Sequence, residues 1–256
     1  MQTVLVTGAS SGIGKAYAYA FAKRGDHIIL TARRKEVLEQ VAEDITKQFH
    51  TTCTVIVQDL SDDDAAITLV KEIEKQGLQV DILVNNAGFA TKGLLSHSDF
   101  AKQQRELAVN IKAVTELTYL LIDKMAERKK GTVINLASAA AFNPVPYNAV
   151  YSATKAYVLS FSQSIAYEYK DKGVYVLAVC PQATDTHFFD EFNKMEGRMR
   201  QPDDVVRSTF RAMKKRKTIC TDGKMCYLQA LMPHFLSRKM CVRITGRVGK
   251  AVWGNT

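Results

Sequence analysis

The sequence lacks long hydrophobic runs and is poor in cysteine. No apolar stretch reaches the roughly 18 residues that a membrane-spanning helix requires, so a transmembrane protein is not expected. The five cysteines are widely spaced and include no CxxC pair, which speaks against a disulfide framework and a zinc site. The first eight residues lack the basic start and cleavage site of a signal peptide. We therefore expect a cytoplasmic chain with unpaired thiols and no bound metal.

Acidic residues are scarce only in the C-terminal quarter. The chain of 256 residues has a formal net charge of +9, yet residues 1–193 carry 20 basic and 22 acidic side chains, whereas residues 194–256 carry 15 and 4. A basic excess can serve nucleic acid, an anionic membrane surface or an anionic small molecule. No RNA- or DNA-binding motif accompanies the basic segment, so a nucleic-acid partner is not expected.

Short runs rich in Val, Ile and Leu alternate with longer amphipathic stretches, which predicts strand–helix units around a parallel sheet with helices on both faces. The strand candidates are Val4–Thr7, His27–Thr31, Thr54–Gln58, Ile82–Asn85, Thr132–Ala137, Val174–Cys180 and Thr218–Thr221. The helical patterns cover Ile13–Arg24, Lys35–Phe49, Asp62–Gln76, Asp99–Arg128, Ala149–Lys170 and Asp203–Lys217, with Ser61 as a predicted N-cap. No internal repeat or linker interrupts the chain, so we expect one α/β domain over residues 1–256, with a doubly wound, Rossmann-type sheet.

A glycine-rich loop follows the first predicted strand and opens the first predicted helix. Glycines at this place permit a tight turn and let backbone N–H groups and the helix N-terminus approach a pyrophosphate, although a plain strand–helix turn has the same composition. The spacing is GxxxGxG, and the candidate dinucleotide contacts are Gly8, Ser10, Ser11, Gly12, Ile13 and Gly14.

The second predicted strand ends in cations where NAD-binding chains carry a carboxylate. The sequence there is Thr31-Ala32-Arg33-Arg34-Lys35, with Glu36 as the first acidic residue. A carboxylate at this point would repel a 2′-phosphate, whereas a guanidinium can pair with one bidentately. Cations near a helix N-terminus also oppose the helix dipole, so they require another reason to be there. The pattern predicts NADP(H), with Arg33 as the phosphate partner.

Tyr151 and Lys155 are four residues apart in a predicted helix and therefore share one face. A nearby ammonium favours phenolate and lowers the pKa of tyrosine toward the range where it exchanges a proton with an alcohol or carbonyl oxygen. Ser138 closes the fifth predicted strand at the carboxyl edge, where its hydroxyl can share charge that develops on a substrate oxygen. The segment Asn85–Gly88 ends at the same edge, and the polar Asn110 lies within a long helical pattern.

Together these motifs resemble the short-chain dehydrogenase/reductase family, in particular its single-domain members of about 250 residues. The matching segments, in the family's order, are Thr7–Gly14, Asp59-Leu60, Asn85–Gly88, Asn110, Ser138, Tyr151–Lys155 and Pro181–Thr186.

The resemblance implies a seven-stranded sheet and a catalytic set made of Asn110, Ser138, Tyr151 and Lys155. In that family Tyr151 would act as general acid in reduction and base in oxidation, Ser138 would orient the substrate oxygen, and Lys155 would lower the Tyr151 pKa and bind the nicotinamide ribose. Asn110 would hold a water in the proton relay. Further cofactor contacts would come from Asp59, Leu60, Asn86, Ala87, Gly88, Pro181 and Thr186. The family usually has glycine after Pro181, where this chain has Gln182, so we expect an altered loop and a weaker case for Thr184 as a contact.

Residues 1–186 are predicted to form the cofactor and catalytic core, and residues 187–256 a substrate loop and a basic C-terminal segment. Apolar side chains at His187–Phe192 and at Phe142, Pro144, Val145 and Tyr147 favour an apolar ketone, steroid or acyl chain over a sugar. Alternatively, these side chains pack against each other. A 3-oxoacyl thioester on acyl carrier protein or coenzyme A is the alternative substrate, and an NADP-binding regulator without turnover is the alternative class.

The segment His234–Trp253, taken as a helix, places Leu236, Met240, Ile244, Val248 and Val252 on one face and Lys239, Arg243, Arg247 and Lys250 on an adjoining one. Such a helix can cover its own domain or a second subunit of a homo-oligomeric dimer or tetramer. It can also lie on anionic lipid as a peripheral membrane contact, or bind an anionic acyl carrier. Gly246 and Gly249 weaken the helical pattern.

Overall fold

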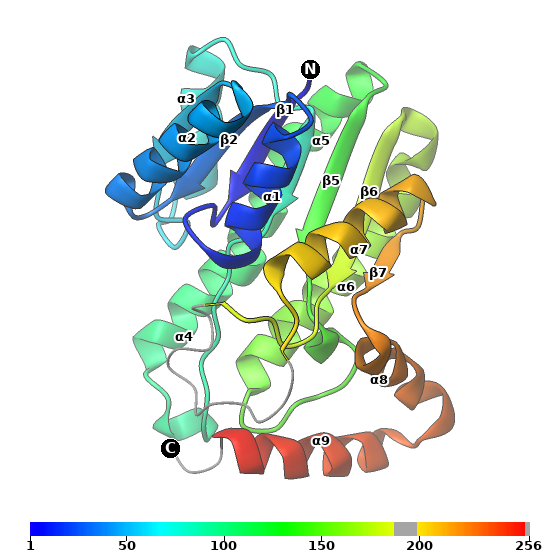
Figure 1. Ribbon diagram of the computed structural model, residues 1–256. Helices are drawn as coiled ribbons and strands as arrows, with labels where there is room; N and C mark the ends of the chain where they lie inside the picture. The colour runs from blue at the N-terminus through cyan, green and yellow to red at the C-terminus, as the bar shows by residue number, and fades with distance from the viewer. Residues whose placement is uncertain (187–198, 254–256) are drawn as a thin grey trace.

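The computed structural model describes residues 1–186 and 199–253, which contain one seven-stranded sheet in the order β3-β2-β1-β4-β5-β6-β7 (Figure 1). Every neighbouring pair of strands is parallel, which confirms the predicted doubly wound sheet. The strand order reverses between β1 and β4, and a crevice at the carboxyl ends of the strands is the usual ligand site at such a reversal. The strands are β1 (Thr3–Thr7), β2 (His27–Ala32), β3 (Cys53–Val57), β4 (Ile82–Asn85), β5 (Gly131–Leu136), β6 (Val174–Cys180) and β7 (Ile219–Thr221).

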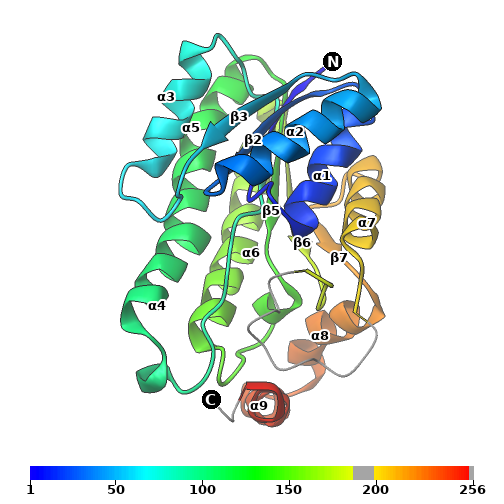
Figure 2. The ribbon, with the colours of Figure 1, turned by 60° about the vertical axis from the view of Figure 1, so that its left-hand side comes forward.

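Helices cover both faces of the sheet (Figure 2). The α-helices are α1 (Gly12–Ala22), α2 (Lys35–Phe49), α3 (Ala65–Lys75), α4 (Phe100–Leu107), α5 (Val114–Glu127), α6 (Ala149–Tyr169), α7 (Pro202–Lys214), α8 (Lys224–Phe235) and α9 (Arg238–Trp253). A π-helical turn, η2 (Ala108–Ala113), joins α4 to α5, and short 3-10 turns occupy η1 (Leu95–His97), η3 (Ala139–Ala141) and η4 (Lys170–Lys172).

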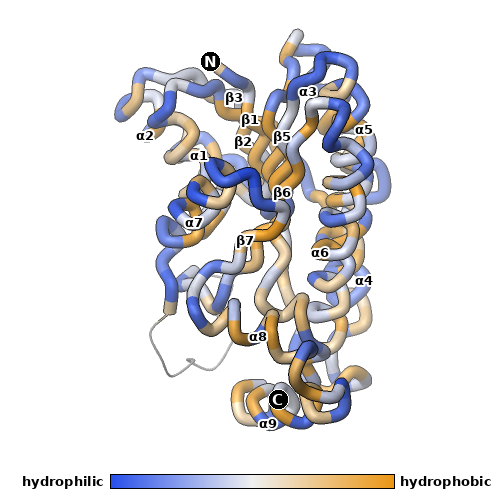
Figure 3. Tube along the Cα trace, turned by 90° about the vertical axis from the view of Figure 1, so that its right-hand side faces the viewer, coloured by the Kyte–Doolittle hydropathy of each residue, from blue (hydrophilic) through white to orange (hydrophobic). Residues whose placement is uncertain are grey.

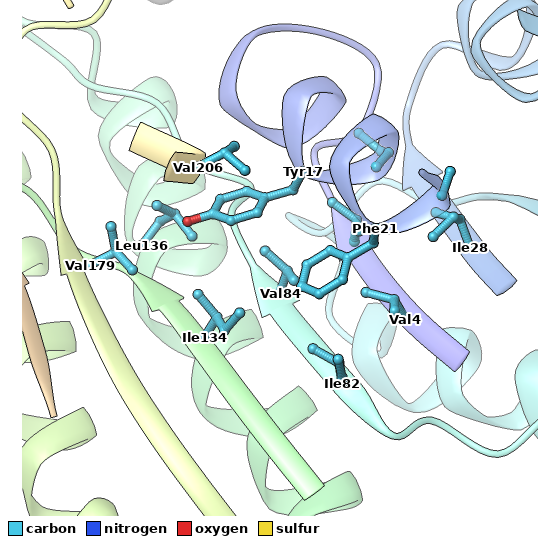
Figure 4. Packing of buried hydrophobic residues seen from close by; sticks show 14 of the residues in the cluster. Val4, Tyr17, Phe21, Ile28, Ile82, Val84, Ile134, Leu136, Val179 and Val206 are labelled. Carbon is cyan, nitrogen blue, oxygen red and sulfur yellow. The ribbon is translucent and has the colours of Figure 1, made fainter. Parts of the chain in front are cut away.

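Two hydrophobic layers hold the helices to the sheet, and the hydrophobic strands between them are coloured orange in Figure 3. On one face, Tyr17 and Phe21 of α1 are fully buried against β1, β4 and β5, beside Val206 of α7 (Figure 4). The Tyr17 hydroxyl meets the Thr209 hydroxyl at 2.5 Å, so its only polar atom is satisfied. Full burial of a large apolar side chain contributes roughly 1.5–3 kcal/mol. This packing fixes α1, and with it the loop that precedes α1.

The start of α3 differs from the prediction. The helix begins at Ala65 rather than Asp62, and Ser61 does not cap it. Both the backbone N–H and the hydroxyl of Ser61 donate to Asp59 Oδ1, at 2.9 and 2.7 Å, so the chain turns back on Asp59 before the helix starts. Ser and Asp compete in this way with helical hydrogen bonds, which is why the local pattern is misleading here.

The C-terminal part of the chain forms two helices rather than one. The predicted segment His234–Trp253 is split, because Leu236 adopts an extended conformation after α8, and Ser237 Oγ accepts the Met240 N–H at the start of α9. Helix α8 was not predicted. No helix in residues 1–186 and 199–253 is both long and apolar enough to cross a membrane. All five cysteines are free thiols.

Candidate active site

The glycine loop between β1 and α1 leaves no room for side chains. Gly8 and Gly12 have φ of +66° and +54°, which L side chains rarely adopt. A Cβ at Gly14 would overlap the Gly8 carbonyl oxygen and the Asn86 amide, and one at Gly12 would lie 2.9 Å from the Thr186 methyl. Ser11 makes no side-chain cap at the N-terminus of α1, and the first turn of α1 carries no acidic residue. Backbone N–H groups and the positive end of α1 therefore remain available to an anion such as a pyrophosphate.

Thr7, the last residue of β1, fastens this loop to the end of β4. Its hydroxyl accepts the backbone N–H groups of Asn86 and Ala87, both at 2.9 Å, and the Asn86 amide donates to the Thr7 carbonyl at 2.8 Å. Asn86 and Ala87 are thus held beside the glycine loop. Asn85 lies deeper and donates to Asn135 Oδ1 at 2.9 Å, so its side chain is structural.

Tyr151, Lys155 and Ser138 meet at the carboxyl end of β5. Helix α6 places Lys155 Nζ 5.6 Å from the centre of the Tyr151 ring, and Lys155 donates to the Leu136 carbonyl, the last residue of β5, at 2.8 Å. Ser138, two residues further on, hydrogen-bonds the Tyr151 hydroxyl. Lys155 is almost fully buried. The Tyr151 phenol and the Ser138 hydroxyl are therefore hydrogen-bonded, and the Lys155 ammonium lies over the Tyr151 ring.

The ionisation of Tyr151 in the chain alone contradicts the sequence prediction. Burial raises the pKa of Tyr151 to about 12, and the hydrogen bond with Ser138 lowers it only in part. The Lys155 ammonium lies 5.6 Å from the centre of the Tyr151 ring and donates to the Leu136 carbonyl, and burial outweighs the groups that lower the Tyr151 pKa. Burial also lowers the pKa of Lys155 to about 8. A buried phenol thus remains protonated, as a general acid must be, while the charge of Lys155 is lost at mildly alkaline pH.

Asn110 lies in the π-helical turn η2, in the middle of the stretch that the sequence predicts as one helix. Its Nδ2 donates to the Phe89 carbonyl at 2.9 Å and to Thr154 Oγ1 at 3.1 Å, and its Oδ1 accepts the Phe89 N–H at 3.2 Å. A Cβ at Gly88 would lie 3.0 Å from Asn110 Oδ1 and 3.4 Å from Lys155 Nζ. Asn110 therefore connects the segment after β4 to the start of α6, which carries Tyr151 and Lys155. π-Helical turns are frequent at functional sites.

Glu106 is a fully buried carboxylate one turn before Asn110 that the sequence analysis missed. Its Oε2 accepts the Thr91 N–H at 2.8 Å and the Thr91 hydroxyl at 2.6 Å, while Oε1 has no partner. Burial raises the pKa of Glu106, and the charges of Lys155 and Lys102 oppose that rise. In turn, the Glu106 charge raises the pKa of both Lys155 and Tyr151. Glu106 lies four residues before Asn110, so in a helix both share one face, and this spacing could have identified Glu106 from the sequence.

We expect Glu106→Gln to shift the pH dependence of kcat/KM for NADPH. Lys155 is charged below its pKa of about 8 and loses the charge as the pH rises, so kcat/KM for NADPH, which reports the free protein, should fall on the alkaline side. Removing the Glu106 charge lowers the Lys155 pKa further, so this limb should move to lower pH. A matched change of the exposed Glu127 on α5 should leave it in place. Identical profiles for Glu106→Gln and the wild type would contradict the coupling.

The other candidate cofactor residues surround Asp59. The charges of Arg33 and Arg105, together with hydrogen bonds from Ser61, hold the pKa of Asp59 below its usual value. Arg105 of α4 was not predicted, although its Nη2 lies 3.0 Å from Asp59 Oδ2. Arg34 Nη2 donates to Ser10 Oγ at 3.3 Å, so one of the cations after β2 reaches the glycine loop. Leu60, next to Asp59, is buried.

Gln182 follows Pro181 in the segment after β6, where the family usually has glycine. Among the described residues, the non-glycine positions with positive φ are His50, Lys129, Tyr147 and Arg216, so Gln182 adopts an ordinary φ. Its side chain lies where a Cβ of Gly223 would be, which ties Gln182 to the turn before α8. The Pro181 carbonyl accepts the Ala139 N–H at 2.9 Å. Thr184 is buried, and its hydroxyl donates to the Gln182 carbonyl at 2.9 Å, whereas Thr186 lies against Gly12.

An ion pair between the partly exposed Arg200 and the buried Asp222 joins this segment to the chain around β7. Arg200 pairs with Thr184 in an isolated parallel bridge, and its guanidinium donates to Asp222 at 2.7 and 3.1 Å. Asp222 is fully buried and also accepts the Ser208 hydroxyl at 2.7 Å. We refer to Arg200, Asp222 and Ser208 as the Arg200 clamp. It joins the segment after β6 to α7 and to the end of β7.

The predicted substrate-lining residues are only partly described. His187–Phe192 lies outside the described residues. Phe142 packs on a small apolar cluster with Cys226, the Pro144 carbonyl accepts the Thr245 hydroxyl of α9 at 2.7 Å, and Tyr147 lies beside Gly249. The loop before Tyr151 is therefore in direct contact with the C-terminal helix.

Comparison with known proteins agrees with this architecture. The family model described as short chain dehydrogenase matches residues 2–197. The very-long-chain 3-oxoacyl-CoA reductase of Anas platyrhynchos is 39% identical over 181 residues, covering 69% of this chain and 58% of that protein. The 17-beta-hydroxysteroid dehydrogenase type 3 of Mus musculus is 34% identical over 187 residues, covering 72% and 61%. The chain thus spans about three-fifths of the length of these curated relatives.

Solved structures show the same fold. A short-chain dehydrogenase from Sphingobium yanoikuyae in complex with NADPH is similar, with a TM-score of 0.81 at 29% identity, over 86% of this chain and 87% of that one. The similarity extends beyond the part of the chain that the family model matches.

Proposed function

Since the chain belongs to the short-chain dehydrogenase/reductase family, we propose that it transfers hydride between NADPH and the carbonyl or secondary alcohol of an apolar substrate. The observation that carries this proposal is the meeting of Ser138, Tyr151 and Lys155 beside a glycine loop that is shaped for backbone contact with an anion. Ketones, steroids and acyl chains are the substrate classes, in keeping with the relatives named above.

The geometry of the loop fits a dinucleotide. At Gly8, Gly12 and Gly14 a side chain would collide with neighbouring atoms, whereas glycine leaves the backbone accessible. The N-terminus of α1 carries no side-chain cap. In the proposal, residues 8–14 hold the pyrophosphate, Arg33 the 2′-phosphate, and Asp59 and Leu60 the adenine. Asn86–Gly88, Lys155, Pro181 and Thr186 hold the nicotinamide side. The cofactor supplies the hydride when bound.

The remaining chemistry belongs to this chain's side chains. Tyr151, kept protonated by its raised pKa, donates its hydroxyl proton to the carbonyl oxygen during reduction and takes it back during oxidation. The Ser138 hydroxyl orients that oxygen and shares its developing charge. Lys155 binds ribose hydroxyls in the proposal. Because the Asn110 side chain is held by Phe89 and Thr154, any water in the relay would use the Asn110 main chain.

Cofactor preference provides a test at a residue outside the catalytic set. Arg33→Ala should weaken NADPH binding by roughly 10–100-fold, which corresponds to loss of charge-assisted hydrogen bonds to a phosphate, and should leave NADH binding unchanged. Lys35→Ala is the matched control, since Lys35 is equally exposed and already pairs with Glu39 at 3.7 Å. Titration calorimetry with both nucleotides measures the difference. Equal losses for NADPH and NADH would contradict the assignment.

A 3-oxoacyl thioester is the second candidate substrate. It is favoured by the relative named as a very-long-chain 3-oxoacyl-CoA reductase and by the basic segment 194–256, which suits an anionic carrier or lipid surface. An NADPH-oxidation panel of 3-oxoacyl thioesters, steroids and aromatic ketones distinguishes the candidates. Oxidation with none of them would count against the proposed function as a whole.

The organisation of the molecule follows from the same proposal. Residues 1–256 act as one domain, in which residues 1–186 form the cofactor and catalytic core and residues 187–256 form the substrate loop and basic segment. We propose a homo-oligomer, dimer or tetramer, in a cytoplasmic setting, where a reducing environment keeps free thiols unpaired.

A further inference from the structure

Helix α9 lies across one end of the molecule. In Figures 1 and 2 it runs beyond the carboxyl ends of the strands, and it forms the outermost element at that end. One side of α9 packs inward. Cys241 and Gly249 are buried, and a Cβ at Gly249 would overlap the Pro146 carbonyl oxygen, so glycine is what allows this close approach. Gly249, one of the two glycines that weaken the sequence pattern, is therefore what lets α9 pack on the loop before Tyr151.

The outward side of α9 is divided into two stripes. Met240, Ile244 and Val248, spaced four residues apart, are 49%, 41% and 55% exposed. The sequence pattern left open whether these residues cover the domain, and in the structure they do not. The second stripe, adjacent on the helix, consists of exposed cations, namely Lys239, Arg243, Arg247 and Lys250. A helix with an exposed apolar stripe beside a basic one is typical of helices that lie in the plane of a membrane interface.

The positive charge of the outward side of α9 limits which partners can bind it. Residues 223–256 contain no Asp or Glu, and among the described residues no carboxylate lies within ion-pair distance of an α9 cation. Two copies facing each other through α9 would bring these cations together, which disfavours a symmetric self-contact. An anionic surface neutralises them instead, and each basic side chain near the surface adds to the attraction.

We propose that the outward side of α9 docks on an anionic phospholipid surface, with the helix axis parallel to the bilayer and Met240, Ile244 and Val248 inserted among the lipids. Other exposed apolar side chains belong to neighbouring segments: Phe235, the last residue of α8, is 80% exposed, and Leu95, two residues after Gly93, is 63% exposed. Tyr147 links these parts, because its carbonyl accepts the Gly93 N–H at 2.8 Å and its ring lies beside Gly249. The inward side of α9 contacts the loop that leads to Tyr151, so docking of the outward side would hold this loop close to the bilayer and shorten the path of a substrate dissolved in lipid. This last step rests on the proposed function.

Co-sedimentation with vesicles tests the docking without any turnover. The full chain is mixed with vesicles of phosphatidylcholine alone or of an equimolar mixture of phosphatidylcholine and phosphatidylserine. Two variants remove one stripe each, Met240→Ser/Ile244→Ser/Val248→Ser and Arg243→Glu/Arg247→Glu. Matched controls change exposed residues on the opposite part of the fold, Val57→Ser/Ile67→Ser and Lys71→Glu/Lys75→Glu. Thermal unfolding and NADPH binding of every variant check that the fold is intact.

The wild type and both controls should sediment with the anionic vesicles, and each stripe variant should lose at least about tenfold in binding. Equal binding to neutral vesicles would overturn the electrostatic part of the proposal, and binding that survives both stripe variants would overturn all of it. A dimer in sedimentation equilibrium that the serine variant dissociates would assign the face to a second copy instead. Vesicle binding in a chain that oxidises no NADPH would leave the docking standing and the proposed function contradicted.

Discussion

Replacing Tyr151 by phenylalanine is expected to lower turnover by about 10²–10⁴-fold, the usual contribution of a positioned general acid, while NADPH still binds. The substitution removes one oxygen and keeps the ring over which Lys155 Nζ lies at 5.6 Å, so the packing of α6 should survive. Ser138 would retain its hydrogen bond to the Ala140 N–H at 3.1 Å but would lose its phenolic partner. Steady-state NADPH oxidation gives the turnover, and titration calorimetry gives the binding.

Tyr157→Phe is the matched control for this loss. Tyr157 is also in α6, is 37% exposed, and its hydroxyl meets the Thr115 hydroxyl at 2.9 Å, away from Ser138. It should keep wild-type turnover. If the two variants lost turnover equally, the effect would be a packing effect of α6, and if Tyr151→Phe kept wild-type turnover, the proton donor would have to be another group.

Arg200→Met should destabilise the fold by about 3–5 kcal/mol, because it leaves Asp222 as a buried charge without a cation. Asp222 is fully buried and accepts two guanidinium hydrogen bonds, at 2.7 and 3.1 Å, so it cannot recover the lost contacts from solvent. Since the Arg200 clamp also holds the segment around Thr184, NADPH binding should weaken as well. Urea unfolding measures the change in the free energy of unfolding, with the same dependence on urea concentration assumed for both proteins.

The neighbouring Arg207→Met provides the comparison. Arg207 pairs with Asp204 on the surface of α7, with 62% of its side chain exposed, and an exposed pair contributes only about 0–1 kcal/mol. If both variants lost the same stability, the burial of Asp222 would not be what makes the clamp strong. A normal free energy of unfolding for Arg200→Met would contradict the clamp altogether.

The sheet and most helices could be predicted because their signals are local. Each strand is a short apolar run and each helix an amphipathic stretch, so the boundaries agree within a few residues for β1, β4 and β6. Helix α8 gave no such signal, because Cys226 is its only buried residue and Pro233 lies inside it. Ser61 was misread as a cap because its choice of Asp59 over the helix depends on how the chain turns.

The part of the site that could be predicted consists of residues that are close together in the sequence. The glycine loop, the Tyr151–Lys155 pair and Arg33 are each visible in a few residues. Arg105 and the Arg200 clamp are not, since Arg105 meets Asp59 across 46 residues and Arg200 meets Asp222 across 22. The direction of the Tyr151 pKa also escaped prediction, because burial, the dominant cause, is a property of the assembled fold.

The most direct measurement of the central claim follows the hydride itself. The protein is incubated with a ketone or 3-oxoacyl thioester that it reduces and with NADPH in which both hydrogens at C4 of the nicotinamide are deuterium, and the product is analysed by mass spectrometry. We predict one deuterium on the carbinol carbon of the product, formed at similar rates by the wild type and Tyr157→Phe and about 10²–10⁴-fold more slowly by Tyr151→Phe. Product without deuterium on that carbon, or labelled product formed equally fast by Tyr151→Phe, would contradict the account.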